Sequence, residues 1–123
     1  MGRVKQLLGQ RGEAIAAGFL RLRGYRILAR NYRSPAGELD LVARQGDTVV
    51  FVEVKTRRTR TFGPPELAVD RHKQRTLTRV AQHYLLQHRL HGVSCRFDVV
   101  TVDMGGVLPR VHHIPGAFDA LEG

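Results

Sequence analysis

Residues 48–55, TVVFVEVK, constrain the fold most strongly, because they are dense in β-branched and aromatic side chains. This composition predicts a β-strand. Side chains alternate across a strand, so one face carries three valines, Val50, Val52 and Val54. The other face carries Phe51, Glu53 and Lys55. A charged pair two residues apart in an otherwise apolar strand is the first candidate for a functional site.

Further elements are predicted before this strand. A helix is predicted over residues 4–23, where apolar side chains recur at helical spacing on one side: Val4, Leu8, Ile15, Phe19 and Leu22. An extended segment over residues 25–33 and a strand over residues 38–44 follow, joined by a turn at 34–37. Alternation in the later strand predicts one face with Glu38, Asp40 and Val42 and the other with Leu39, Leu41 and Ala43.

The C-terminal half supplies a second helix and further strands. Residues 56–66 form a basic loop, and residues 67–90 form a helix with an inner stripe of Leu77, Val80, Ala81, Tyr84 and His88. A strand over residues 96–103 follows, and a short strand is considered at 107–114. The long helix allows a right-handed crossover that returns the next strand parallel to the third. The order α-β-β-β-α-β therefore predicts an α/β fold with a mixed sheet flanked by helices.

The length of 123 residues, 42% of them apolar, suits one domain. We expect its core to span about residues 4–114, with a frayed C-terminal tail. No apolar run reaches the roughly 18 residues of a membrane-spanning helix, and no signal-peptide pattern is found, so we expect a cytoplasmic protein. Cys95 is the one cysteine, which excludes an internal disulfide and predicts a buried, inert thiol.

The net charge of +9, with 17 arginines among the 20 basic residues, indicates a polyanionic partner. Arginine binds phosphate oxygens bidentately, and phosphate neutralisation releases counterions. Nucleic acid is therefore the expected partner. Compositional bias and ribosome association are the alternatives.

Asp40, Glu53 and Lys55 form the main candidate site. Glu53 and Lys55 share one face of their strand, and Asp40 lies across a short hairpin, so the three side chains could converge. Two adjacent carboxylates are costly without a cation between them. Mg²⁺ or Mn²⁺ would suit these acids with a backbone carbonyl such as that of Val54. Lys55, expected to be charged, would orient water or stabilise an oxyanion. The alternative is an exposed Glu–Lys pair and an unrelated hairpin charge. No phosphate loop or dinucleotide pattern suggests an organic cofactor.

Three short motifs resemble a known family. Residues 37–42 (GELDLV), 50–55 (VFVEVK) and 11–14 (RGEA) are similar to the YraN family, and the likeness covers residues 9–103. That family is assigned to the PD-(D/E)XK nuclease superfamily, with similarity to archaeal Holliday-junction resolvases. The resemblance implies a restriction-endonuclease-like core, with Asp40 and Glu53 as the motif's acids and metal ligands and Lys55 as its lysine.

The resemblance also implies that Glu13 is the helical acid of the resolvase-like branch. Helical spacing, however, places Glu13 opposite Ile15 and near Ala17 and Leu20, which does not aim it toward the sheet. A solvated helix charge is the alternative. Leu39, rather than proline, precedes the first acid, and the Gln-x-x-x-Tyr signature of some related nucleases is absent.

Basic residues outside these motifs are candidates for phosphate contact: Arg57, Arg58, Arg60, Arg71, Arg75 and Lys73. Each has a solvated or structural alternative. Asp98 could supplement the metal site, with a structural carboxylate as the favoured reading. The sequence thus predicts a Mg²⁺- or Mn²⁺-dependent endonuclease acting on DNA, branched or structured forms being considered. The alternatives are a noncatalytic nucleic-acid-binding module or a ribosome- or repair-associated adaptor. A homodimer is considered because one active site cuts one strand, but no interface is identified.

Overall fold

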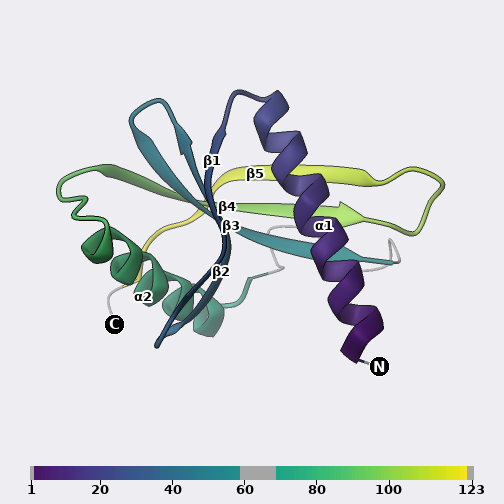
Figure 1. The fold of residues 1–123 in the computed structure, drawn as a ribbon, viewed down its shortest axis with the longest axis horizontal. Coiled ribbons are helices and arrows are strands. Elements are labelled where there is room, and N and C mark those ends of the chain that lie inside the picture. Colours follow the sequence, from purple (N-terminus) through teal and green to yellow (C-terminus); the bar gives the residue numbers. More distant parts are fainter. Residues whose placement is uncertain (1, 59–68, 122–123) are drawn as a thin grey trace.

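The computed structural model describes residues 2–58 and 69–121, which form two helices and five strands (Figure 1). In chain order these are α1 (Gly2–Leu22), β1 (Arg26–Ser34), β2 (Gly37–Gln45), β3 (Thr48–Arg57), α2 (Arg71–Gln87), β4 (Ser94–Asp103) and β5 (Arg110–Phe118). Neither helix in these ranges combines the length and apolar character needed to cross a membrane.

The strands form a single sheet whose spatial order follows the chain, β1-β2-β3-β4-β5. The first three strands are an antiparallel meander. The connection through α2 returns β4 parallel to β3, and β5 pairs antiparallel with β4. The predicted mixed α/β fold is therefore confirmed, and the arrangement is consistent with a restriction-endonuclease-like core.

The two helices cover opposite faces of the sheet. Val50 and Val52 of β3 belong to a buried cluster with the α1 residues Ala16, Ala17 and Leu20. The alternate residues of β3 belong to a second cluster with α2, whose principal members are Val49, Phe51, Leu77, Val80 and Tyr84. Because neighbouring residues of β3 pack against different helices, β3 is buried on both faces, which explains its nearly continuous apolar sequence.

The face by which α1 contacts the sheet differs from the prediction. Gly12, Ala16, Ala17 and Leu20 are buried, whereas Leu22, assigned to the inner stripe, is 91% exposed. Small side chains let the helix lie close to the strands, so the contact face is marked by small residues more than by large ones. The predicted apolar stripe of α1 was therefore wrong at Leu22.

Other boundaries also differ from the prediction. α2 begins at Arg71 because Asp70 caps it by accepting the Lys73 N–H at 2.8 Å. β5 continues to Phe118, which pairs with and stacks on Phe97 of β4, so the strand extends past residue 114 with an irregularity in its pairing before Phe118. Cys95 is exposed rather than buried. It precedes the buried part of β4.

Candidate active site

β2 and β3 separate at Asp40, and this opening creates the candidate site. Their backbone pairing stops at Leu41 and Val52. Beyond that pair the Asp40 carboxylate accepts the Val54 N–H at 2.8 Å, in place of a backbone carbonyl. Asp40 is thereby fixed against the backbone of the central strand.

The predicted alternation of β2 fails at this position. Leu39 and Val42 both pack in the cluster on the α2 side, whereas Leu41 packs on the α1 side. A regular strand would place residues 39 and 42 on opposite faces. The assignment of Glu38, Asp40 and Val42 to one face was therefore wrong, because the regular alternation of side chains between the two faces is interrupted at Asp40.

Glu53 lies beside Asp40 and is almost completely buried, its side chain being 5% exposed. Burial, together with a hydrogen bond and charge repulsion from Asp40, raises the pKa of Glu53 to about 8, although two lysines oppose this shift. The Glu53 Oε2 atom is 3.8 Å from Lys55 Nζ and 3.4 Å from Lys73 Nζ. The structure therefore brings Asp40, Glu53 and Lys55 together, and it adds Lys73.

Lys73 reaches the site from the first turn of α2, where Asp70 fixes the helix start. Both lysine side chains are 41% exposed, so each combines an ion pair with access to solvent. Lys73, a candidate for phosphate contact, was predicted either to approach the active face or to lie along the core. Its observed partner is the buried carboxylate.

Glu13 also faces this site, contrary to the expectation from helical spacing. It lines an open pocket of about 380 Å³ together with Asp40, Val54 and Thr56. Burial and the negative charges of Asp40 and Glu38 raise the pKa of Glu13, while Arg30 lowers it. The expectation was wrong because it took the large apolar residues as the buried side of α1. The small residues that are in fact buried lie on the side of Glu13.

The approach of α1 depends on Gly12, next to Glu13. A Cβ atom at Gly12 would overlap the Thr56 side chain of β3. Glycine therefore allows the helix to touch the strand one residue before the acid. Because Gly12 has no side chain, α1 can approach β3 closely, and this approach brings the neighbouring Glu13 carboxylate to the site.

The acids suit a hard divalent cation that keeps open positions. Asp40 and Glu53 supply carboxylate oxygens, and Mg²⁺ is commonly held by one or two carboxylates with water and substrate phosphate. Burial, and then the hydrogen bond and charge of Asp40, raise the pKa of Glu53, and such a cation would relieve the repulsion between the two acids. Within residues 2–58 and 69–121, no group of three His, Cys, Asp or Glu side chains could hold a metal ion. The two carboxylates therefore suit Mg²⁺ or Mn²⁺ whose other ligands are water and phosphate. They do not suit a site in which protein side chains fill every coordination position.

Asn31, Glu38 and Arg30 lie around Glu13 and were not identified from the sequence as site residues. All three belong to the β1–β2 hairpin. A weak signal was available, since asparagine is disfavoured inside strands. Their proximity to α1 depends on tertiary packing, which helical or strand periodicity does not report.

The predicted phosphate-contacting arginines differ in their surroundings. Arg57 is only 13% exposed and pairs with Asp103 at 3.4 Å, which ties the end of β3 to the end of β4. Arg58, Arg71 and Arg75 are exposed. Arg60 lies outside the described residues. The exposed arginines therefore remain better placed than Arg57 for contact with a polyanion.

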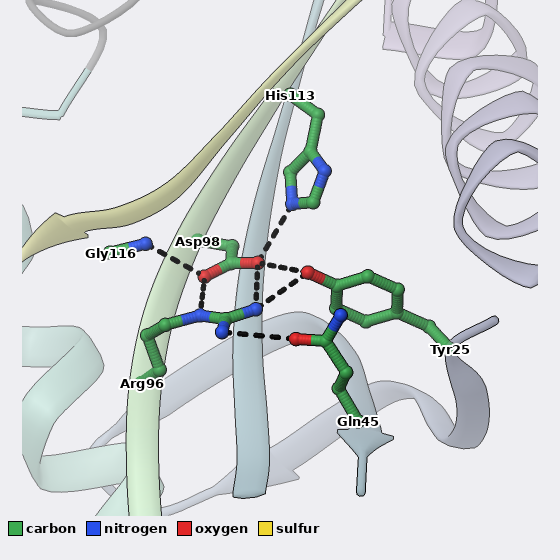
Figure 2. A network of polar contacts seen from close by, with 6 residues as sticks. All are labelled: Tyr25, Gln45, Arg96, Asp98, His113 and Gly116. Atoms are coloured by element: carbon green, nitrogen blue, oxygen red, sulfur yellow. Dashed lines mark hydrogen bonds and ion pairs between the residues drawn. The ribbon is translucent and has the colours of Figure 1, made fainter. Parts of the chain in front are cut away.

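Asp98 is not part of the candidate site. It lies on β4 in a buried polar network (Figure 2). Its oxygens accept from Arg96 Nε at 2.8 Å, Arg96 Nη2 at 3.1 Å and Gly116 N at 3.0 Å, and lie 2.8 Å from His113 Nε2. Tyr25 Oη is also within 3.5 Å. Burial raises the pKa of Asp98, but hydrogen bonds from His113, Arg96 and Gly116 outweigh it and leave the pKa lowered. These partners show a structural carboxylate.

Comparison with known proteins places the chain in a family. Residues 12–102 match the model of "Uncharacterised protein family UPF0102". The chain belongs to this family. A UPF0102 protein of Syntrophotalea carbinolica is 53% identical over 112 residues, covering 91% of each chain. A UPF0102 protein of Geobacter metallireducens is 46% identical over 112 residues, covering 91% of this chain and 92% of the relative. UPF0102 is the YraN family that the motifs resemble.

Proposed function

We propose that this protein is a Mg²⁺- or Mn²⁺-dependent endonuclease that hydrolyses phosphodiester bonds in DNA. The observation that carries the proposal is the convergence of Asp40, Glu53 and Lys55 where β2 and β3 separate. The net charge of +9 and the exposed arginines Arg58, Arg71 and Arg75 add support, because they suit a phosphate backbone.

In this mechanism Asp40 and Glu53 would hold the cation. When bound, the cation would neutralise charge on the phosphate and lower the pKa of water. Lys73, the nearer lysine, offsets the charge of Glu53. Lys55 is farther from that carboxylate and 41% exposed, so its ammonium can donate to a phosphate oxygen or to the attacking water.

The test is cleavage of a panel of DNA and RNA substrates with Mg²⁺, with Mn²⁺ and with a chelator. The panel contains linear duplex, single strand, flap and four-way junction. We expect DNA cleavage that requires the metal. Lys55→Ala should lower the rate by about 10²- to 10³-fold and leave DNA affinity within about twofold, since a single exposed charge adds little to binding.

Arg79→Ala is the matched control, because it removes one positive charge from the exposed side of α2. It should retain cleavage. If wild type and Lys55→Ala bind DNA equally and neither cleaves it with metal, the proposed enzymatic activity is overturned and a noncatalytic nucleic-acid-binding module is favoured. Cleavage restricted to RNA would overturn the proposed substrate.

A further inference from the structure

Asn31 has an unusual backbone conformation directly opposite Asp40. The register pairs Arg30 with Leu41 and Tyr32 with Leu39, so Asn31 and Asp40 face each other across the β1–β2 ladder. Asn31 has φ of 52°, in the left-handed region that non-glycine residues seldom adopt. Ala29 and Tyr32 both pack on the α2 side. The alternation of side chains in β1 is therefore interrupted at Asn31, as it is in β2 at Asp40.

The side chain of Asn31 contacts two acids. With its amide nitrogen turned toward the carboxylates, it donates to Glu13, whose two oxygens lie 3.1 and 2.9 Å away, and to Glu38 at 3.3 Å. Glu38 is also paired with Arg33 at 3.5 Å. Asn31 thus connects the helical acid to an anchored carboxylate on the hairpin.

A neutral amide suits this position for a chemical reason. Glu13 lies near the negative charges of Asp40 and Glu38, each of which acts on it more strongly than the positive charge of Arg30, so an unassisted carboxylate would be repelled from them. The amide offers two N–H donors and no positive charge. It holds Glu13 in place and leaves the negative charge that would attract a cation. A lysine at this position would neutralise that charge.

We propose that Asn31 is a positioning residue that holds Glu13 toward Asp40 and so completes the environment of the bound cation. This inference rests on the proposed function. The left-handed backbone turns the amide toward α1, and the amide fixes the carboxylate. Outer residues that orient groups at a metal site typically contribute about 10- to 100-fold to metal affinity or activity.

The test measures Mn²⁺ affinity and DNA cleavage for Asn31→Gly. Glycine accepts φ of 52° without strain and removes the side chain that carries the amide, so the protein should stay folded. We expect Mn²⁺ affinity and the cleavage rate each to fall by about tenfold or more. Arg89→Gly is the matched control, because Arg89 has φ of 54° and follows α2. It should change neither quantity.

A double-variant cycle with Glu13→Gln separates positioning from general stability. If Asn31 acts through Glu13, Asn31→Gly should have little further effect on Mn²⁺ affinity once Glu13→Gln is present. Unchanged Mn²⁺ affinity in Asn31→Gly, or losses that multiply in the double variant, would overturn the positioning role. Wild-type protein that binds no Mn²⁺ would overturn both the positioning role and the proposed function. If Mn²⁺ binds and the effects of Asn31→Gly and Glu13→Gln on its affinity are coupled, but no substrate is cleaved, the proposed nuclease activity is overturned and the positioning role stands.

Discussion

The contact between α1 and β3 can be tested by adding a single methyl group at Gly12. A Cβ there would overlap Thr56 Oγ1 and lie 2.9 Å from Thr56 Cβ. Thr56 is β-branched, so its side chain has little rotational freedom to move away. Replacing glycine by alanine inside a helix contributes roughly 0.5–1 kcal/mol of stability, whereas inserting a methylene into a packed contact costs roughly 1–3 kcal/mol. Gly12→Ala should therefore lower the free energy of unfolding by about 1–2 kcal/mol.

Gly18→Ala in the same helix is the matched control, because a Cβ at Gly18 has no neighbouring atom within 4 Å. It should raise the free energy of unfolding by about 0.5–1 kcal/mol. Urea denaturation followed by circular dichroism measures both variants, which should differ by roughly 2 kcal/mol. If Gly12→Ala is as stable as Gly18→Ala, the close approach of α1 is refuted, together with the explanation for the position of Glu13.

Two further predictions concern buried carboxylates. The pKa of Glu53 is raised to about 8, so the folded state keeps a proton that the unfolded chain releases above its ordinary pKa of 4.5. Stability without metal should therefore fall between pH 4.5 and 8, and the stability of Glu53→Gln relative to wild type should rise by about 4 kcal/mol over that range. A difference that does not change with pH in urea titrations contradicts this. Asp98→Ala would leave Arg96 and His113 without their buried partner. It should lower the free energy of unfolding by about 3–5 kcal/mol, and a loss below 1 kcal/mol would show that the network is dispensable.

The strand pattern was predictable because local composition and long-range packing agree there. The run at residues 48–55 is apolar on both faces because helices cover both, and β3 lies where it was expected. The crossover through α2 and the parallel β3–β4 pair followed from chain order. For α1 the same reasoning failed, because Leu22 is apolar yet exposed, whereas the contact is made by Gly12, Ala16 and Ala17 together with Leu20.

The candidate site was predictable to the extent that it lies on one strand. Glu53 and Lys55 are two residues apart on β3, and strand geometry alone places them on one face. Lys73 comes from α2. Its approach to the active face was one of two alternatives, and its ion pair with Glu53 depends on how α2 packs on the sheet. Asn31 and Glu13 meet only because α1 packs against the β1–β2 hairpin.

The sequence by itself determined the order of helices and strands, the mixed sheet and the acid–lysine pair on β3. The order of elements and the acid–lysine pair follow from side-chain spacing and backbone preference within short segments, and the mixed sheet follows from the order of those segments along the chain. Only the tertiary structure decided which side of α1 touches the sheet, where β2 leaves β3, and which groups surround Glu13. Those features depend on the volume available between elements and on charges brought together from distant segments.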